Sequence, residues 1–219
     1  MTDFPRRFTW RDNGLAPDEV SELRTILGSG GLVAYPTDTF YGLGVHPEFP
    51  SALEKLYTAK GRDRQKPISL IVSGFDVVQK WAEDLPPAFF VLSKRFWPGP
   101  LTLVLRTERG MARGCPGFQE TIALRFPASK PACLLAELCG GAVTATSANL
   151  AGKPECREPD EVCRQLGAFL DAVLDAGSLE AKRPSTIVDL TGENPEIVRE
   201  GAVDKKAVEE TLRPRYTRR

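Results

Sequence analysis

Apolar residues recur along the chain with two spacings, and the change from one spacing to the other separates predicted helices from predicted strands. Val20, Leu23 and Leu27 follow helical spacing after Pro17, whereas residues 32–35 form a short apolar run that Pro36 ends. The same criteria predict helices at 17–27, 50–59, 75–81, 87–97, 132–138, 159–169 and 204–212, and strands at 32–35, 68–72, 101–105, 122–124, 142–144, 172–174, 186–190 and 196–198. Strands and helices alternate irregularly, and several strands are close enough for antiparallel pairing. We therefore predict an α/β fold with a large twisted open sheet, mixed parallel and antiparallel, and flanking helices.

The segment 37–44 directly follows the strand that Pro36 ends. Its sequence, TDTFYGLG, holds two glycines and three short polar side chains. Glycine and short polar residues are typical of loops whose backbone can come close to a ligand. We expect a loop over the whole of this segment.

Length and composition are those of one ordinary globular domain. The chain has 219 residues, of which 42% are hydrophobic, and folding at this length buries roughly 70% of the unfolded surface. We expect a single domain over residues 1–219 with a core at about 15–205. The tail 213–219 holds four arginines and is predicted to fray as a solubilising end, with a weak RNA or phosphate contact as the alternative.

The charge balance excludes a uniformly basic coat for nucleic acid. Lys and Arg number 29, and so do Asp and Glu, so any phosphate or RNA contact must come from a local cluster. No apolar run approaches the roughly 18 residues of a membrane helix, and the opening residues show no secretory signal. We expect a cytoplasmic protein with no membrane partner.

Cysteine and histidine usage excludes several kinds of site. The five cysteines form no CxxC pair, which favours reduced structural thiols over disulfides or a zinc knuckle. His46 is the sole histidine, so a histidine-based triad or a two-histidine metal site is excluded by count. A loop surface position before Pro47 is favoured for His46 over a lone acid/base role.

Cations recur with a period of two in the segment 60–66. They are Lys60, Arg62, Arg64 and Lys66, with only Asp63 to offset them. If the segment is extended, these side chains project from one side of the backbone, where an anion such as a polyphosphate would relieve their repulsion. A solvated, salt-screened loop is an equally good interpretation of the spacing alone.

A string of small polar residues, TATSANLAGK at 144–153, follows the predicted strand at 142–144. Ligands bind at the carboxyl ends of strands in open α/β sheets, and Ser and Asn side chains there can hold phosphate or its Mg²⁺. A capped turn before the next helix explains the same residues equally well.

Three further positions are weaker signals. Arg125 follows the predicted strand at 122–124, where a guanidinium can bind a carboxylate in bidentate fashion, although a structural ion pair is the commoner use. Ser185 opens one strand and Arg199 closes the next. The chain contains no GxxxxGK[ST] sequence and no GxGxxG after a strand, which excludes the usual P-loop and dinucleotide sites.

Taken together, these segments resemble the YrdC family, the L-threonylcarbamoyl-AMP synthases. The matching segments occur in the family's order. They are YPTDTFYGLG at 35–44, KGR at 60–62 followed by Lys66-Pro67, WPGPLT at 97–102, ALRFP at 123–127, TSANLAGKP at 146–154, STIVD at 185–189 and REG at 199–201. Each is weak alone, but seven in order are specific.

The resemblance implies a reaction, a cofactor and partners. L-threonine, bicarbonate and ATP would give threonylcarbamoyl-AMP and pyrophosphate, with Mg²⁺ carried by the ATP phosphates and no metal site of the protein's own. A separate transferase complex would use the product to modify adenosine 37 of tRNA. The implied fold is a large twisted α/β sheet with the site on its concave face, which agrees with the mixed sheet predicted above.

The resemblance also implies roles for individual residues. For ATP they are Lys60, Arg62, Arg64, Thr121, Ser147, Asn149 and Arg199, and Lys60 and Arg62 are the catalytic pair. For L-threonine they are Thr37, Ser69, Arg125 and Ser185, with Arg125 on the carboxylate. Such a reaction needs alignment and charge neutralisation but no covalent enzyme intermediate, so the shortage of histidine is no obstacle.

Two other functions compete with this one. A module that binds double-stranded RNA or the ribosome is a use known among such proteins, but the zero net charge argues against it as the main role. The carbamoyl-transfer domain of hydrogenase maturation factors belongs to much longer chains with zinc-finger-like cysteines, which are missing here.

Overall fold

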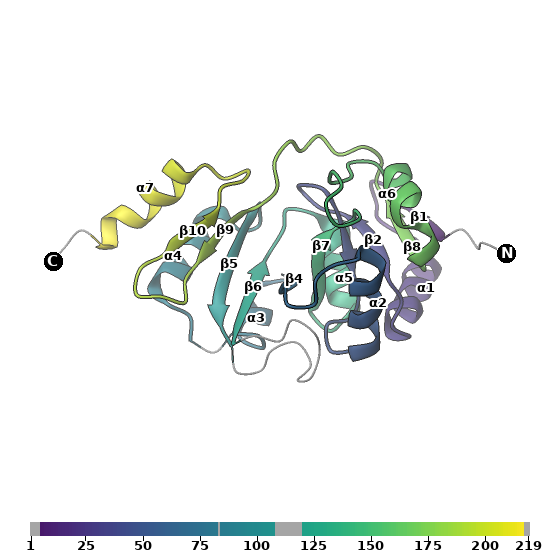
Figure 1. The fold of residues 1–219 in the computed structure, drawn as a ribbon, viewed down its shortest axis with the longest axis horizontal. Helices are drawn as coiled ribbons and strands as arrows, with labels where there is room; N and C mark the ends of the chain where they lie inside the picture. Colours follow the sequence, from purple (N-terminus) through teal and green to yellow (C-terminus); the bar gives the residue numbers. More distant parts are fainter. Residues whose placement is uncertain (1–4, 83, 108–119, 217–219) are drawn as a thin grey trace.

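The computed structural model describes residues 5–82, 84–107 and 120–216. Within these ranges all strands join one sheet in the order β1-β8-β2-β3-β7-β4-β6-β5-β9-β10, with helices packed around it (Figure 1). The strands are β1 (Arg6–Thr9), β2 (Val33–Pro36), β3 (Tyr41–Gly44), β4 (Ser69–Val72), β5 (Leu101–Arg106), β6 (Thr121–Arg125), β7 (Ala142–Ser147), β8 (Ala172–Asp175), β9 (Thr186–Asp189) and β10 (Glu196–Arg199). The helices are α1 (Pro17–Gly28), α2 (Pro50–Lys60), α3 (Phe75–Val78), α4 (Pro87–Phe96), α5 (Lys130–Leu138), α6 (Pro159–Leu166) with the 3-10 turn Gly167–Phe169, and α7 (Lys205–Tyr216).

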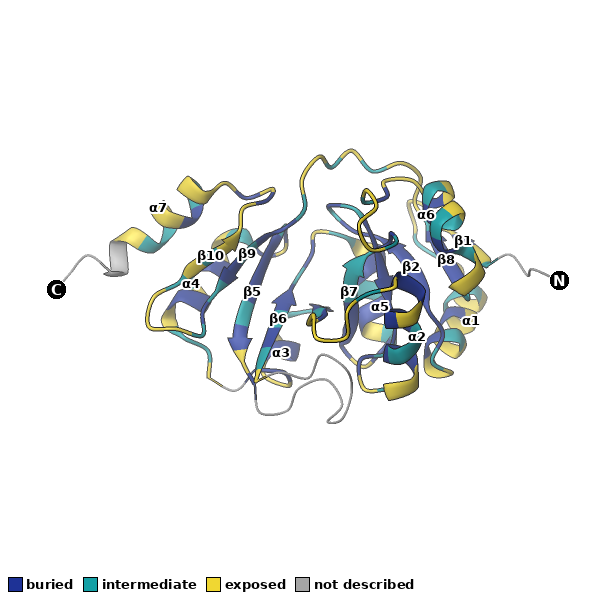
Figure 2. Ribbon diagram, in the orientation of Figure 1, coloured by how far each residue is buried: buried dark blue, intermediate teal, exposed yellow. Residues whose placement is uncertain are grey.

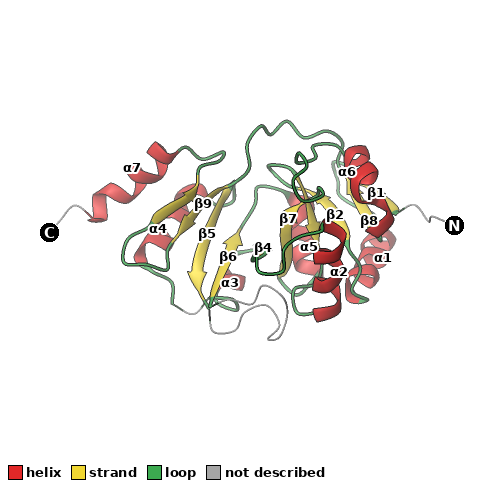
Figure 3. Cartoon of the chain, viewed as in Figure 1, coloured by secondary structure: helices red, strands yellow, loops and turns green. Residues whose placement is uncertain are grey.

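The sheet is mixed, as predicted. In the described ranges, four pairs of neighbouring strands are parallel. They are β1–β8, β2–β8, β4–β6 and β5–β9. The pairs β2–β3, β3–β7, β4–β7, β5–β6 and β9–β10 are antiparallel. Strands β1 and β10 form opposite edges, and residues 176–185 run as a long loop from β8 across to β9 (Figure 3). None of the helices in the described ranges has the length and apolar run that a bilayer crossing needs.

Strand β3 corrects the prediction of a continuous loop over 37–44. Only the first part of that segment is a loop, because Tyr41–Gly44 pairs with β2 and places Gly42 opposite Tyr35. A Cβ at Gly42 would lie 3.1 Å from the Tyr35 ring, and one at Gly44 would lie 2.8 Å from it. The glycines therefore make room for an aromatic ring on the neighbouring strand, which a sequence pattern does not distinguish from a loop.

The other helices and strands differ less from the ranges predicted from the sequence. Strand β1 was not predicted, because only Phe8 of its four residues is buried and the strand exists through its pairing with β8. Helix α3 ends at Val78, earlier than the predicted 81. In the tail, residues 213–216 continue α7, and residues 217–219 lie outside the described residues.

The two faces of the sheet pack against different helices. In β4, Leu70 and Val72 belong to one core cluster together with residues of α2, α3 and α4. Ile71, between them, belongs to a second cluster that contains residues of α1 and α5. Side chains alternate between the faces of a strand, so the two clusters lie on opposite faces.

One half of the second face has no helix over it. The second cluster contains no residue of β5 or β6, although both strands supply leucines such as Leu103 and Leu124 to the first cluster. The central strands are nonetheless largely buried (Figure 2). The fold thus leaves a half-covered face over β4, β6 and β5.

Gly201 provides a test of how closely the chain packs beside that face. A Cβ on Gly201 would lie 2.2 Å from the backbone oxygen of Pro184 and 2.5 Å from the carbonyl carbon of Ser185, so the backbone must move. We expect Gly201→Ala to lower the free energy of unfolding by about 2–3 kcal/mol. Urea denaturation followed by circular dichroism measures this.

The matched control is Gly192→Ala. The nearest atom to a Cβ there is 3.8 Å away, so this variant should unfold like the unmodified chain. Equal stability of the two variants would contradict the packing described here.

Candidate functional site

A cavity of about 440 Å³ lies on the half-covered face of the sheet. Each of four central strands contributes to its wall a pair of residues spaced by two positions, as residues on one face must be, and β7 adds Thr146 at its end. The pairs are Ser69 and Ile71 of β4, Thr102 and Val104 of β5, Ala123 and Arg125 of β6, and Ala145 and Ser147 of β7. Several of these side chains are small, and their size leaves the space that a helix fills elsewhere.

The cavity wall is rich in positive charge. It contains Arg62, Lys66, Arg125 and Arg199, and Glu155 as the one carboxylate among the lining residues. Cations gathered in a partly desolvated hollow attract anions, and phosphates or carboxylates most strongly through arginine. The cavity is therefore built for an anionic ligand.

Arg199 and Ser185 form a connected group on one side of the cavity. Arg199 donates from Nη2 and Nε to the backbone oxygen of Ser185, at 2.9 and 3.1 Å, and from Nη2 to its hydroxyl at 3.2 Å. The Ser185 hydroxyl also lies 2.9 Å from that of Thr102. Burial lowers the pKa of Arg199, and the nearby Glu155 opposes that shift.

Lys60 lies behind the cavity wall rather than on it. Its side chain is 3% exposed and donates hydrogen bonds to the backbone oxygens of Ser147 and of Asn149, the latter at 2.8 Å. Burial, with Arg62 as the next cause, lowers the pKa of Lys60 to about 8. Lys60 therefore holds the end of β7 in place, directly under Ser147.

Asn149 organises the same loop from within. Its amide nitrogen donates to the backbone oxygens of Leu150, at 3.0 Å, and Lys153, at 2.6 Å. Its side-chain oxygen is buried and has no partner among the described residues. Ser147 thus faces the cavity, while Lys60 and Asn149 support the loop that follows it.

The cations of 60–66 do not share one side of an extended strand, which corrects that hypothesis. Lys60 is the last residue of α2, and Gly61 ends the helix with φ +58°. A turn follows, in which the backbone N–H of Lys66 donates to the backbone oxygen of Asp63. Arg62 and Lys66 reach the cavity. Arg64 is exposed and pairs with Glu54 at 2.7 Å. The end of the helix and the turn determine where each of these side chains points, and the spacing of charges along the sequence does not show this.

Arg62 is incompletely paired for a partly buried arginine. Its Nη2 donates to the backbone oxygen of Pro67 at 3.0 Å, while its Nε is buried without a partner among the described residues. Unpartnered buried donors are rare in folded proteins and call for an explanation. An anion in the cavity supplies one.

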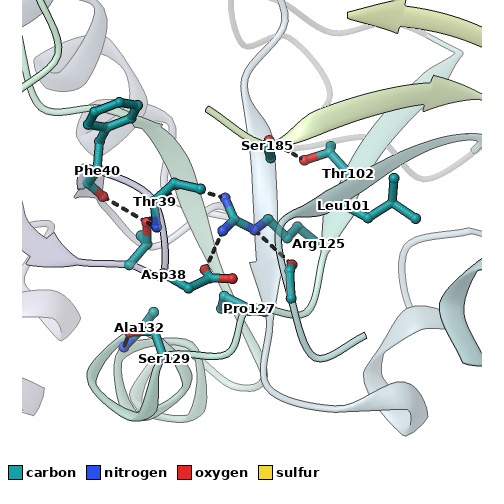
Figure 4. Close-up of polar contacts among 12 residues, drawn as sticks. Asp38, Thr39, Phe40, Leu101, Thr102, Arg125, Pro127, Ser129, Ala132 and Ser185 are labelled. Carbon is teal, nitrogen blue, oxygen red and sulfur yellow. Dashed lines mark hydrogen bonds and ion pairs between the residues drawn. The ribbon is translucent and has the colours of Figure 1, made fainter. Parts of the chain in front are cut away.

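The 37–40 loop and Arg125 form another part of the cavity wall, and Thr102 and Ser185 lie beside Arg125 (Figure 4). The Thr37 hydroxyl donates to the backbone oxygen of Phe40 at 2.7 Å, and it lies 3.0 Å from the hydroxyl of Thr39. Arg125 is 7% exposed; burial lowers its pKa, and Asp38 opposes that effect. Ser69 lies between these groups and β7, and donates to the backbone oxygen of Ala145 at 2.6 Å.

Most of the residues that the resemblance assigned converge on this one cavity. Those in its wall are Thr37, Arg62, Ser69, Arg125, Ser147, Ser185 and Arg199. Lys60, Arg64, Asn149 and Thr121 are not in the wall, and Thr121 pairs with Arg106 at the far end of β6. The ligand roles of all eleven stay predictions.

Sequence reasoning did not assign four polar residues that the structure places at the site. They are Asp38 and Thr39 on the loop, Thr102 on β5, and Glu155. The loop residues share a short polar segment with Thr37, which was the one available signal. Nothing in the sequence relates Thr102 to Ser185, 83 positions away.

None of the cysteines in the described ranges is in the cavity wall, and neither is His46. Burial raises the pKa of Cys133 and Cys156 to about 11 and that of Cys139 to about 12, and all cysteines in the described ranges are free thiols. Cys115 lies outside those ranges. His46 stacks on Phe49 at 4.2 Å, outside the cavity wall.

Comparisons with known proteins place the chain in a family. The model of the Sua5/YciO/YrdC family, described as "Telomere recombination", matches residues 25–201, well over half of the chain. This chain belongs to that family. The predicted membership is thereby confirmed, and the matched range covers the whole cavity wall.

Curated members of the family resemble the chain over most of its length. The threonylcarbamoyl-AMP synthase of Pyrococcus abyssi is 34% identical over 183 residues, 84% of this chain and 54% of that protein. The putative threonylcarbamoyl-AMP synthase of Mycobacterium tuberculosis is 35% identical over 185 residues, 84% of both chains. The chain thus spans about half the length of the Pyrococcus relative. These names support the predicted enzyme class.

A solved family structure shows the same fold. The Sua5 protein of P. abyssi, complexed with L-threonine, matches with a TM-score of 0.88 and 30% identity, over 96% of this chain and 61% of that one. The predicted YrdC-like fold is confirmed.

The lowered pKa of Lys60 predicts how stability depends on pH. The folded pKa of about 8 lies below the ordinary 10.5, so between these values the unfolded chain binds more protons than the folded chain. Lys60 therefore makes the free energy of unfolding rise with pH in that window, by at most about 1.4 kcal/mol per pH unit. Urea denaturation at pH 7.5 and 9.5 measures this contribution as the difference between the unmodified chain and Lys60→Met, because the raised pKa values of the buried cysteines act in the opposite direction in both proteins.

Lys94→Met is the matched control, because Lys94 is an exposed lysine on α4. It should keep the pH dependence of the unmodified chain. Parallel pH profiles for the Lys60 variant and the unmodified chain would contradict the buried state of Lys60.

Proposed function

We propose that this chain makes L-threonylcarbamoyl-AMP and pyrophosphate from L-threonine, bicarbonate and ATP. The observation that carries the proposal is the convergence of Arg62, Arg125, Ser147, Ser185 and Arg199 on one cavity of about 440 Å³. Membership of the family and the L-threonine complex of the P. abyssi relative support it.

The cavity offers two kinds of anion site. Arg62 and Lys66 form no ion pair among the described residues, and with Arg199 and Ser147 they are suited to the phosphates of ATP. Arg125 is in the cavity wall with Thr37 and Ser69 and is paired with Asp38, and it is suited to the carboxylate of L-threonine. Lys60 and Asn149 support the phosphate side by holding the loop of Ser147.

The reaction needs alignment rather than an enzyme nucleophile. The threonine amine adds to the carbon of bicarbonate with loss of water, and a carbamate oxygen then attacks the α-phosphorus as pyrophosphate leaves. Fixed cations around the cavity stabilise the negative charge that develops on the phosphates. Arg62 and Arg199 are placed for this role, and no residue changes its covalent state.

The residues of this cavity fit a magnesium ion that binds together with ATP. The described residues contain no cluster of three or more acidic, histidine or cysteine side chains that could hold a metal by themselves. The hydroxyl of Ser147 and the carboxylate of Glu155 are hard oxygen ligands of the kind Mg²⁺ accepts alongside phosphates. When bound with ATP, the ion would neutralise phosphate charge.

The product is an activated acyl-adenylate, which a separate transferase complex would use to modify adenosine 37 of tRNA in the cytoplasm. Weak RNA binding, by the basic tail or elsewhere, would be an additional property.

The decisive assay is release of pyrophosphate from ATP by the purified chain. We expect release only when L-threonine, bicarbonate and Mg²⁺ are all present, because the carbamate is the nucleophile. Release independent of L-threonine or bicarbonate would contradict the proposed reaction. Salt-sensitive retention of RNA without turnover would favour the RNA-binding alternative.

Arg62→Ala tests the phosphate side of the cavity. Removing one preorganised charged donor typically lowers the rate by on the order of 10²–10³. We expect that loss in pyrophosphate release, with little change in thermal stability, because the Arg62 side chain makes only one hydrogen bond within the described part of the protein.

Arg24→Ala is the control, because Arg24 is an exposed arginine on α1 outside the cavity wall. It should release pyrophosphate at the unmodified rate. Normal turnover by the Arg62 variant would remove Arg62 from the proposed site.

A further inference from the structure

Asp38 lies between two cavity residues, Thr37 and Thr39, and pairs with Arg125 across the sheet. Arg125 projects from β6, which is separated from β3 by β7 and β4 in the strand order. The carboxylate oxygen Oδ1 of Asp38 accepts a hydrogen bond from Nη2 of Arg125 (Figure 4). The two side chains are 12% and 9% exposed, so solvent hardly weakens their attraction.

The protein occupies three sides of the Arg125 guanidinium. Nε donates to the backbone oxygen of Gly99 at 3.2 Å, Nη1 to the Thr39 hydroxyl at 3.2 Å, and Nη2 to Asp38. A guanidinium carries five N–H groups. One N–H on each terminal nitrogen therefore has no partner among the described residues, and Arg125 is in the cavity wall.

We propose that Asp38 is a positioning residue, which fixes the Arg125 guanidinium so that its two remaining N–H groups face the carboxylate of the amino-acid substrate. The inference rests on the proposed function, in which that substrate is L-threonine. Two parallel N–H groups match the two oxygens of a carboxylate, and their value depends on the plane in which the guanidinium is held.

A purely stabilising ion pair explains the arrangement poorly. The second carboxylate oxygen of Asp38, Oδ2, is buried without a partner among the described residues. A buried pair contributes to stability only when its remaining hydrogen-bonding groups are satisfied as well. The pair therefore stabilises the fold less than a fully hydrogen-bonded pair would, but it does orient an arginine of the cavity wall.

The pairing also separates two kinds of anion. Arg125 with Asp38 is formally neutral, whereas Arg62 and Lys66 have no ion-pair partner among the described residues. A polyphosphate is attracted most strongly to the unpaired cations. A single carboxylate can still bind the neutral pair through directed hydrogen bonds, so Asp38 keeps the Arg125 position for the amino acid.

The test compares Asp38→Asn and Asp38→Ala with the unmodified chain. Calorimetric titration with L-threonine should give a Kd raised about tenfold in Asp38→Asn and further in Asp38→Ala. The KM for L-threonine should rise in parallel, while the KM for ATP changes less than about twofold. Thermal melts report folding, and the milder asparagine variant keeps the test valid if the alanine variant unfolds.

Glu180→Gln is the matched control. Glu180 is an exposed carboxylate near Asp38, in the neighbouring hollow formed by 37–39 and 179–181. Its loss should leave binding of L-threonine unchanged. Unchanged binding in a folded Asp38→Ala variant, or equal losses for ATP and L-threonine, would overturn the positioning role.

An NMR measurement separates this inference from the proposed function. Held on three sides, the Arg125 guanidinium should rotate slowly and give resolved Nη–H signals in ¹⁵N-labelled protein, and both Asp38 variants should lose them. If the unmodified chain binds no L-threonine, the proposed function fails, and the positioning role then stands or falls on these signals. Signals that persist in both variants would overturn it.

Discussion

The strict alternation of side chains along the central strands determines where this protein packs a core and where it leaves a cavity. On one face of β5 and β6, leucine and isoleucine pack against helices; on the other face, Thr102 and Ala123 line the cavity. A strand has no third direction for its side chains, so small or polar residues such as Ser69, Thr102 and Ala123 on the cavity face reduce the apolar surface that a helix would need. The uncovered half-face is the result.

The cavity then concentrates charge in an asymmetric way. One arginine, Arg125, is paired with a buried carboxylate, while Arg62 and Lys66 are not paired within the described part of the chain. Coulomb attraction to a polyanion is therefore greater on the side of α2, and directed hydrogen bonding dominates on the side of the 37–40 loop.

Support behind the cavity wall matters as much as the wall itself. Lys60 is buried beneath Ser147 and binds backbone oxygens, and Asn149 folds the following loop back on Lys153. Two residues that resemble ligand contacts in the sequence thus act within the protein in this structure. The hydrogen bonds of Lys60 and Asn149 hold the loop that follows β7, and with it Ser147, which is in the cavity wall.

The sequence by itself determined the mixed α/β sheet, most helices and strands, and the motifs that indicate the family. These depend on local periodicity and on residue types that can be read one segment at a time. Only the tertiary structure decided that 41–44 is a strand, that the cations of 60–66 diverge, and that Asp38, Thr102 and Glu155 belong to the site. Each of these follows from contacts between residues far apart in the chain, such as the Tyr35 ring beside Gly42 or Asp38 beside Arg125. Spacing along the sequence carries no information about which distant side chain occupies the neighbouring space.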